Sequence, residues 1–362
     1  MIVEQGAPLW RTRKTIKKEE KMKNRTMLFG VFVIALAGLV LFSSAALAKP
    51  IELSLALIIP PRHLRYINVL DPWIKMIDER TGGKVKVTPY FSSALATPPE
   101  TFDAAVSGVA DICEGIAYAT PGRFPLSETV MLPELGLKTG LSCSRALWQV
   151  YKTTPEVQAE YAGVKVLWLH VTPAVKLILR KKSVRTLEEL KGLKLRVSGA
   201  TAVKTGRALG FTPVSMPIGD VYLGLEKGVI DGAALPSELL ISRRLGEVSK
   251  YVTDIDLGHD TFFVVMNQKT WNKLPQDIQK VFEELSGDWA VDFTGKAWDG
   301  FDGEAETKMK AKGFQYITLD PKEEARWKRA LAPVREEYAA ELEARGLPGK
   351  EILRKFEELA GK

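Results

Sequence analysis

After residue 48, apolar and polar positions follow one another in a way that predicts strands and helices in alternation. Continuous or alternating apolar runs are typical of strands, and apolar residues three or four positions apart are typical of helices. The first strands are expected at 51–59, 84–90 and 109–113, with helices at 65–80 and 100–106 between them. Prolines and glycines near the ends of these elements keep the joints short. Such an alternation indicates a parallel sheet covered by helices.

A second set of elements with the same pattern occupies the middle of the chain. Strands are expected at 164–170, 174–181, 194–197, 212–215, 229–233 and 261–267, and helices at 202–209 and 220–227. From residue 276 the pattern is helical, at 276–300 (with Trp289, Phe293 and Trp298 at core-like spacing), 321–345 and 350–359. No sequence repeat or low-complexity linker separates the two sets. We therefore predict an α/β fold of two lobes that share strands and a long connecting helix, with a ligand cleft between their sheets.

Residues 1–48 are expected to lie outside this fold as an N-terminal extension and a signal peptide. Residues 22–25 are basic, 27–42 are almost entirely apolar, and Ala46-Leu47-Ala48 fits the small-x-small rule for cleavage of a secretory signal. The 21 residues before Met22 exceed what a signal needs, which favours Met22 as the true initiator. A retained anchor is the alternative, because 27–48 is long enough to span a bilayer.

The formal charge of +7 belongs mainly to this leading segment. Eight basic and three acidic residues lie within residues 1–48, so the rest of the chain carries only +2. A charge this small gives no indication of binding to nucleic acid or to an anionic membrane surface. Two cysteines, Cys113 and Cys143, are too few for a disulfide-dependent scaffold, and the sequence leaves open whether they form a bridge.

Signatures of catalysis are scarce. The histidines His63, His170 and His259 are far apart, and none has a neighbour at metal-ligand spacing. The motifs G-x-S-x-G, H-E-x-x-H and C-x-x-C are absent, and the stretch GATAVKT at 199–205 has Val203 where a phosphate loop needs its second glycine. The sequence therefore favours binding over catalysis and predicts no cofactor.

Arg196 is the strongest candidate for contact with a ligand. It is the last residue but one of the stretch TLEELKGLKLRV, at the tip of a predicted strand, where Leu195 would face the core and Arg196 the opposite side. The small residues at 198–201 open a helix whose free N–H groups favour an anion. A guanidinium in this position offers a planar fork to a carboxylate. The alternative is a surface arginine that pairs with Glu188 or Glu189.

A series of longer motifs covers most of the chain after residue 48. They are TGGKVKV at 81–87, SGVADI at 107–112, PGRFPL at 121–126, LEELKGLKLRV at 187–197, ALGFTPVSM at 208–216, DVYLGLEKGVIDGA at 220–233 and VVMNQKTWNKLP at 264–275. In this order and spacing, behind a signal peptide, the set resembles the solute-binding proteins of tripartite ATP-independent periplasmic (TRAP) transporters.

This resemblance implies a monomeric two-lobe flytrap of the periplasmic-binding-protein type, whose first lobe regains a strand and a helix late in the chain. Lobe one would comprise residues 49–173 and 262–300, and lobe two residues 174–261 and 301–362. The resemblance also implies a small carboxylate as ligand, the membrane subunits of a TRAP transporter as partners, and the periplasm as location.

The resemblance also assigns residues to the ligand carboxylate. The carboxylate-binding arginine of the family ends its KGLKxR motif, which falls on Arg196. A second basic residue often lies twenty positions upstream in the family. Here that residue is Lys176, which would add charge but no second planar fork.

Two departures from the family pattern concern the rest of the ligand. Ala234 stands where some relatives carry a glutamate that assists metal-bridged substrates, so no bound metal is expected. Leu235, followed by Pro236, replaces an asparagine that contacts polar substituents in sugar-acid binders. Ile218 and Tyr118 would extend this apolar wall. We expect it to favour a less hydroxylated acid with an aromatic or branched body.

The predicted function is therefore capture of a monocarboxylate by closure of the lobes, and its delivery to a TRAP permease. One alternative is a ligand-sensing receptor, because the closed lobes could equally dock a membrane sensor. The other is an exported lyase or hydrolase with Asp220 or Asp231 as base, against which the lack of a nucleophile–base pair counts.

Overall fold

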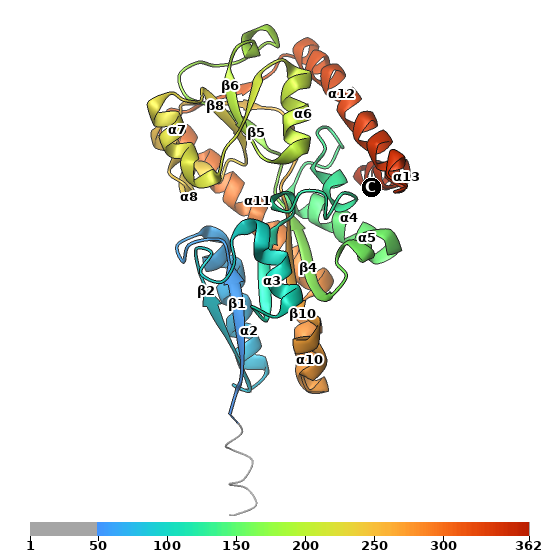
Figure 1. Ribbon diagram of the computed structural model, residues 1–362. Helices are drawn as coiled ribbons and strands as arrows, with labels where there is room; N and C mark the ends of the chain where they lie inside the picture. The colour runs from blue at the N-terminus through green and yellow to red at the C-terminus, as the bar shows by residue number, and fades with distance from the viewer. Residues whose placement is uncertain (1–48, 362) are drawn as a thin grey trace, which may run out of the picture. The chain divides into compact units, whose positions relative to one another are not determined.

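The structure of the chain, a computed structural model, describes residues 49–361, and the chain from Ile51 onward forms one compact unit. Two sheets, each covered by helices, make up its two lobes (Figure 1). The predicted signal segment lies outside the described residues, so the start site and the cleavage remain predictions. Within residues 49–361, no helix combines the length and the apolar character needed to cross a membrane.

The first sheet consists of the early strands and one strand that returns late in the chain. Its strands are β1 (Ile51–Leu57), β2 (Val85–Tyr90), β3 (Ile112–Ile116), β4 (Val164–Val171) and β10 (Thr261–Asn267), in the order β2-β1-β3-β10-β4. β1 runs parallel to β2 and β3, whereas β10 lies antiparallel between β3 and β4. β10 is buried along its whole length, in agreement with its continuous aromatic and β-branched composition.

The second sheet is built from the middle of the chain and has the same mixed character. Its strands are β5 (Lys176–Leu179), β6 (Lys194–Val197), β7 (Thr212–Ser215), β8 (Gly232–Leu235), β9 (Tyr251–Asp254) and β11 (Gln315–Thr318), in the order β11-β9-β5-β8-β6-β7. The chain crosses between the sheets at 172–175 and again at 255–260, and these two crossings run beside each other. The predicted two-lobe fold with shared strands is confirmed.

Helices cover both sheets, and one long helix passes from lobe to lobe. They are α2 (Asp71–Arg80), α3 (Thr101–Ser107), α4 (Gly140–Thr153), α5 (Pro155–Glu160), α6 (Gly199–Leu209), α7 (Val221–Lys227), α8 (Leu239–Ser242), α9 (Gln268–Lys273), α10 (Gln276–Glu284), α11 (Gly287–Ala311), α12 (Pro321–Ala344) and α13 (Gly349–Ala360). α11 is the connecting helix: Val291 packs in the core of lobe one and Met309 in a core of lobe two. The helix predicted at 276–300 is interrupted before Gly287, and Trp289 is 37 % exposed rather than core.

The predicted lobe boundary is wrong for the last part of the chain. Residues 301–362 were all expected in lobe two, but α12 is long enough to contact both lobes (Figure 1). Trp327 belongs to the core of lobe two, whereas Tyr338 and, on α13, Phe356 belong to the core of lobe one. Pro333 lies between these two parts of α12, where its missing N–H removes one helical hydrogen bond.

Two predicted strands begin three residues later than expected, for the same reason in both lobes. The segments after Gly108 and Gly228 are turns, and both glycines end a helix in the left-handed conformation. An aspartate then accepts a hydrogen bond from the neighbouring strand: Asp111 from the N–H of Ser54, and Asp231 from the N–H of Lys194. The apolar run that suggested a strand is thus mostly turn. Cys113 and Cys143 are both buried and free, which answers the open question of a bridge.

Candidate functional site

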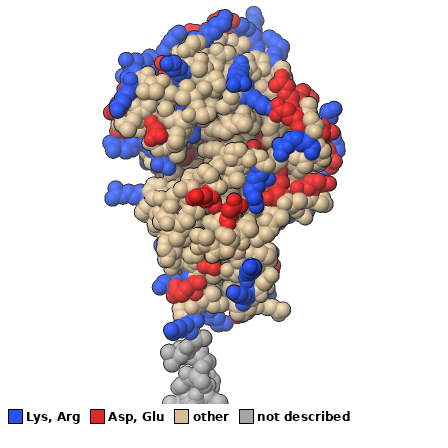
Figure 2. Space-filling view, viewed as in Figure 1, with Lys and Arg blue, Asp and Glu red and all other residues tan. Residues whose placement is uncertain are grey.

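A cavity of about 750 Å³ lies between the two sheets and is lined by both lobes. Figure 2 shows the hollow between the two halves of the molecule. Lobe one contributes the chain that follows β1 and β3, and lobe two contributes the ends of β6, β7 and β8 with the chain that follows them. Because these strand ends from both sheets meet here, a ligand in the cavity would touch both lobes.

Arg196 is buried in this cavity, with 3 % of its surface exposed. β6 lies between β7 and β8, so the base of the side chain is held at the centre of a sheet. Arg196 Nε donates to the backbone oxygen of Met216 at 3.0 Å, and Nη1 donates to Ser198 Oγ. A guanidinium fixed in this way is preorganised for a planar anion.

The surface pairing considered as the alternative for Arg196 is wrong. Glu188 Oε1 lies 2.5 Å from Nη2 of Arg326 on α12. Glu189 instead accepts a hydrogen bond from the backbone N–H of Arg185 at 2.6 Å. Both carboxylates therefore have other partners, and Arg196 faces the cavity.

Tyr118 of lobe one meets Arg196 and Ser198 of lobe two. Burial and the nearby Asp260 raise the pKa of the Tyr118 hydroxyl, while Arg196 and Ser198 act to lower it. Gly199, at a φ of +76°, permits this approach, because a Cβ on it would lie 2.9 Å from Tyr118 Cβ. The structure thus brings two of the predicted site residues together across the cleft.

The other predicted apolar residues line the same cavity. Ile218 lies just after β7, Leu235 is the last residue of β8, and Pro236 follows it. Phe262 on β10 continues the apolar lining from lobe one. The expected apolar wall is therefore next to Arg196, and its contact with a ligand remains a prediction.

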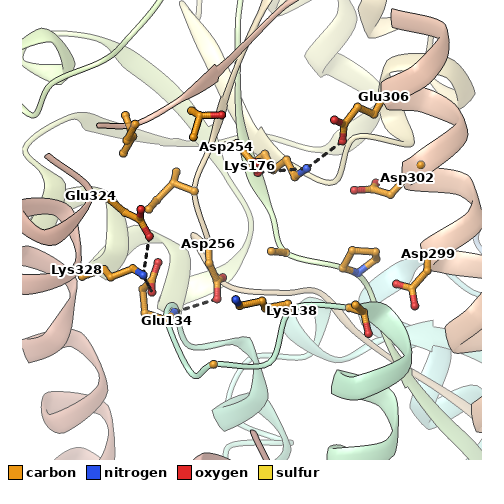
Figure 3. A pocket seen from close by; sticks show the side chains of 18 residues that line it. Glu134, Lys138, Lys176, Asp254, Asp256, Asp299, Asp302, Glu306, Glu324 and Lys328 are labelled. Carbon is orange, nitrogen blue, oxygen red and sulfur yellow. Dashed lines mark hydrogen bonds and ion pairs between the residues drawn. The ribbon is translucent and has the colours of Figure 1, made fainter. Parts of the chain in front are cut away.

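Lys176, by contrast, does not line this cavity. It lines a separate cavity of about 550 Å³, where most of the charged residues are acidic (Figure 3). Its Nζ lies 3.3 Å from Asp254 Oδ1 and 3.6 Å from Glu306 Oε2. The expectation that Lys176 assists Arg196 is therefore corrected: its charge is already paired, with residues of β9 and α11.

Replacing Lys176 with alanine should leave the affinity for an acid ligand within about twofold of the original, since only a charge outside the cavity is lost. Calorimetry on the wild type and the Lys176→Ala variant checks this. A tenfold loss of affinity would show that Lys176 does contribute to ligand binding.

Lobe one contributes a buried ion pair that the sequence did not reveal. Arg65 Nε lies 2.6 Å from Glu114 Oε1, and the two side chains are 4 % and 0 % exposed. The Arg65 guanidinium also lies over the ring of Phe262, 4.3 Å from its centroid. Trp298 Nε1 donates to His170 Nδ1 at 3.0 Å, and the His170 ring stacks on Phe262. One signal was available: Glu114 is a charged residue within an apolar strand.

Two buried carboxyl groups complete the charged lining. Burial raises the pKa of Asp260 to about 6, although Arg196, His259 and Arg65 act in the opposite direction. Burial raises the pKa of Glu238 to about 7. Both groups share the cavity with three arginines, which are Arg65, Arg196 and Arg243. The lining is thus apolar for most of its extent, with charges of both signs at particular positions.

His63 is neutral in this setting. Burial, together with Arg65 and Arg243, lowers the pKa of His63 to about 2. Its Nδ1 accepts a hydrogen bond from the backbone N–H of Arg65 at 3.2 Å, so the ring proton is on Nε2.

The neutral His63 should make the protein sensitive to acid. Below pH 6.5 the unfolded chain protonates His63 and the folded chain does not, so the stability it contributes is present above pH 6.5 and is lost as the pH falls. His63→Asn keeps an acceptor for Arg65 but removes this titration. We expect the free energy of unfolding of the wild type to fall by about 2 kcal/mol more than that of His63→Asn between pH 7.5 and pH 5. Denaturant unfolding at both pH values measures the difference, and parallel pH profiles would contradict it.

These features define a class of protein: two α/β lobes joined by crossing strands and a long helix, with a buried arginine in the cleft between them. Comparison with known proteins supports this class. Residues 55–342 match the family model described as bacterial extracellular solute-binding protein, family 7, and the chain belongs to this family.

Solved structures of related proteins share the whole fold. A TRAP solute-binding protein from Rhodoferax ferrireducens, in complex with copurified benzoate, is 27 % identical, with a TM-score of 0.81 over 86 % of this chain and 98 % of that one. A protein of the same type from Bordetella bronchiseptica, with bound (R)- and (S)-mandelate, is 28 % identical, with a TM-score of 0.78 over 86 % and 99 %. A monocarboxylate 2-oxoacid-binding periplasmic protein from Nostoc sp. is 26 % identical over 252 residues, 67 % of each chain. The predicted class, a TRAP solute-binding protein, is confirmed.

Proposed function

We propose that this chain binds a small monocarboxylate with an aromatic or branched body in the cleft and delivers it to the membrane subunits of a TRAP transporter. The observation that carries the proposal is Arg196, buried at the end of β6 with Ser198 and Tyr118 around it. The apolar residues Ile218 and Leu235 beside it support an apolar body. The chain would act as a monomer in the periplasm, after removal of residues 1–48.

A thermal-shift screen of the purified protein tests the ligand class. The panel contains aromatic and branched monocarboxylates, dicarboxylates and sugar acids. A ligand at one hundred times its dissociation constant stabilises the folded state by about 2.7 kcal/mol, which raises the melting temperature measurably. The proposal expects the largest shifts from monocarboxylates with apolar bodies. Shifts from sugar acids or dicarboxylates alone would contradict it.

Delivery to a permease is tested separately, by uptake of the labelled acid into cells. Loss of uptake when the gene for this chain is deleted supports transport. Unchanged uptake, with loss of a transcriptional response to the acid, would favour the sensing alternative.

Binding without turnover is part of the proposal. Cys143 Sγ lies 3.6 Å from His259 Nδ1, a pair that resembles a nucleophile and its base. Both residues are almost completely buried, and neither lines the cavity of Arg196, so a bound acid would not reach them. We expect the acid to be recovered unchanged after incubation with the protein.

A further inference from the structure

The end of lobe two that lies farthest from the cleft is basic, although the chain after residue 48 carries a net charge of only +2. The segment 180–194, from the end of β5 to the start of β6, contains six basic and two acidic residues. Both acids have partners, since Glu188 pairs with Arg326 and Glu189 accepts from the backbone N–H of Arg185. Among residues 49–361, no carboxylate forms an ion pair with any of the six cations, which are Arg180, Lys181, Lys182, Arg185, Lys191 and Lys194.

The strands of the second sheet extend this surface. Four of them begin or end in one row of paired residues, which are Leu179, Leu195, Gly232 and Tyr251. The residues one position further out are Arg180, Lys194, Asp231 and Lys250, three cations and an acid that accepts the N–H of Lys194. Arg196 and Leu235 lie at the other ends of β6 and β8, so this row faces away from the cleft. Figure 2 shows lysine and arginine side chains along the top of the molecule, where this end of lobe two lies.

Two exposed apolar side chains lie among these cations. Arg180 Nη2 donates to the backbone oxygen of Glu226 at 2.8 Å, which holds the end of α7 against this row. Val229, in the turn after α7, is 54 % exposed. Leu223 is 50 % exposed and precedes Lys227 by one helical turn, so both lie on the same face of α7. We call the surface formed by residues 180–194, 223–229 and Lys250 the basic end of lobe two.

The corresponding end of lobe one has an equivalent valine but different charges. Val109 follows Gly108 as Val229 follows Gly228, and Val109 is 59 % exposed. Three cations of that end, however, pair with carboxylates of α10: Arg80 with Glu284, Lys84 with Asp277 and Lys165 with Glu283. The cations without carboxylate partners are therefore particular to lobe two and do not follow from the fold alone.

This combination of side chains fits an anionic phospholipid surface. Each basic residue close to such a surface strengthens binding about fivefold. The methylene stems of lysine and arginine, together with Val229 and Leu223, match the boundary between headgroups and acyl chains. A dissolved polyanion would satisfy the cations but offers no apolar layer to the two exposed apolar side chains.

We propose that the basic end of lobe two binds the surface of a membrane that contains anionic phospholipids. Because this end faces away from the cleft, the cleft stays open to solution while the protein is held at the membrane. The inference concerns a second site, so it holds or fails independently of the acid that the cleft binds.

Co-sedimentation with vesicles tests the proposal. Residues 1–48 are basic and apolar enough to bind lipid by themselves, so the protein used begins at residue 49; the chain from Ile51 onward is one compact unit with its own cores. Vesicles of phosphatidylcholine and phosphatidylglycerol in equal amounts should bind about tenfold more strongly than phosphatidylcholine alone, and high salt should abolish the difference. Equal binding to both kinds of vesicle, or binding to neither, would overturn the proposal.

Matched triple variants locate the surface. Weakening of about a hundredfold on anionic vesicles is expected, at fivefold for each lost charge, from Lys181→Ala, Lys182→Ala and Arg185→Ala combined. The control removes three exposed charges from lobe one and should weaken binding less than about threefold; it combines Lys84→Ala, Lys86→Ala and Lys280→Ala. Melting temperatures and the affinity for the acid should be unchanged in both. An equal loss in the two would mean that net charge attracts the protein, and the basic end would have no special role.

A further pair of variants distinguishes a membrane from a soluble polyanion. Val229→Ser should weaken binding to anionic vesicles about fivefold, whereas Val109→Ser, its equivalent in lobe one, should not. If the two variants bind equally well, the apolar part of the contact is wrong. Binding of inorganic polyphosphate without binding of vesicles would assign the basic end to a soluble polyanion and overturn the proposal.

Discussion

Replacing Arg196 with alanine is expected to reduce the affinity for the acid ligand about 30-fold or more. The guanidinium is 3 % exposed and is held by Met216 and Ser198, so its charge acts on a carboxylate with little screening by water. Loss of one partner from such a buried charge pair costs about 2–5 kcal/mol, and each 1.4 kcal/mol is a factor of ten in the dissociation constant. Calorimetry with the acid that gives the largest thermal shift measures the loss.

Two further variants make this result specific. Arg196→Lys keeps the charge but not the planar fork, so it should recover only part of the affinity. Arg185→Ala removes an exposed arginine from the same lobe and should change the affinity by less than about twofold, since exposed charges are screened. If Arg196→Ala still binds the acid as tightly as Arg185→Ala, another group holds the carboxylate.

Arg196 could be predicted from the sequence because its signals are local. The structure contains the strand at 194–197, and after Ser198 the helix α6 begins at Gly199. All of these signals therefore lie next to one another in the sequence. The apolar residues Ile218 and Leu235 were expected from departures from the family pattern, and the structure places them after β7 and at the end of β8, the two strands that flank β6.

The rest of the site depends on contacts between residues that are distant in the chain. Arg65 pairs with Glu114, 49 positions later, and lies over Phe262 of β10, a strand that returns to the first sheet after five strands of the second sheet along the chain. Hydrophobic periodicity carries no information about such pairs. Lys176 was misplaced for the same reason, since its partners Asp254 and Glu306 come from a later strand and a later helix.

The boundary between the lobes was predicted wrongly for a different reason. A helical pattern predicts where α12 begins and ends, and both ends were found within a residue. It does not say against which core each half of the helix packs. The half that begins after Pro333 faces lobe one, so the last helix, α13, belongs there with it. The lobes are therefore connected by the two strand crossings, by α11 and by α12.

The buried pair Arg65–Glu114 should matter most for stability. Glu114→Leu preserves the volume of the side chain but leaves the Arg65 charge buried without its counter-ion. Breaking a buried pair in this way costs about 3–5 kcal/mol, a large share of the total stability of a domain. Denaturant unfolding should show this loss, because Glu114 is completely buried and both of its oxygens lie within 3.2 Å of the Arg65 guanidinium.

Two comparisons isolate the cause of this loss. The exposed pair Arg145–Asp292 has equally short contacts, with Nε 2.6 Å from Oδ1, yet Asp292→Leu should cost no more than about 1 kcal/mol because water screens the pair. The double variant Arg65→Met with Glu114→Leu removes both buried charges and should recover most of the stability lost in Glu114→Leu alone. If the double variant were as unstable as the single one, the loss would come from packing around β3, and the ion pair would not be its source.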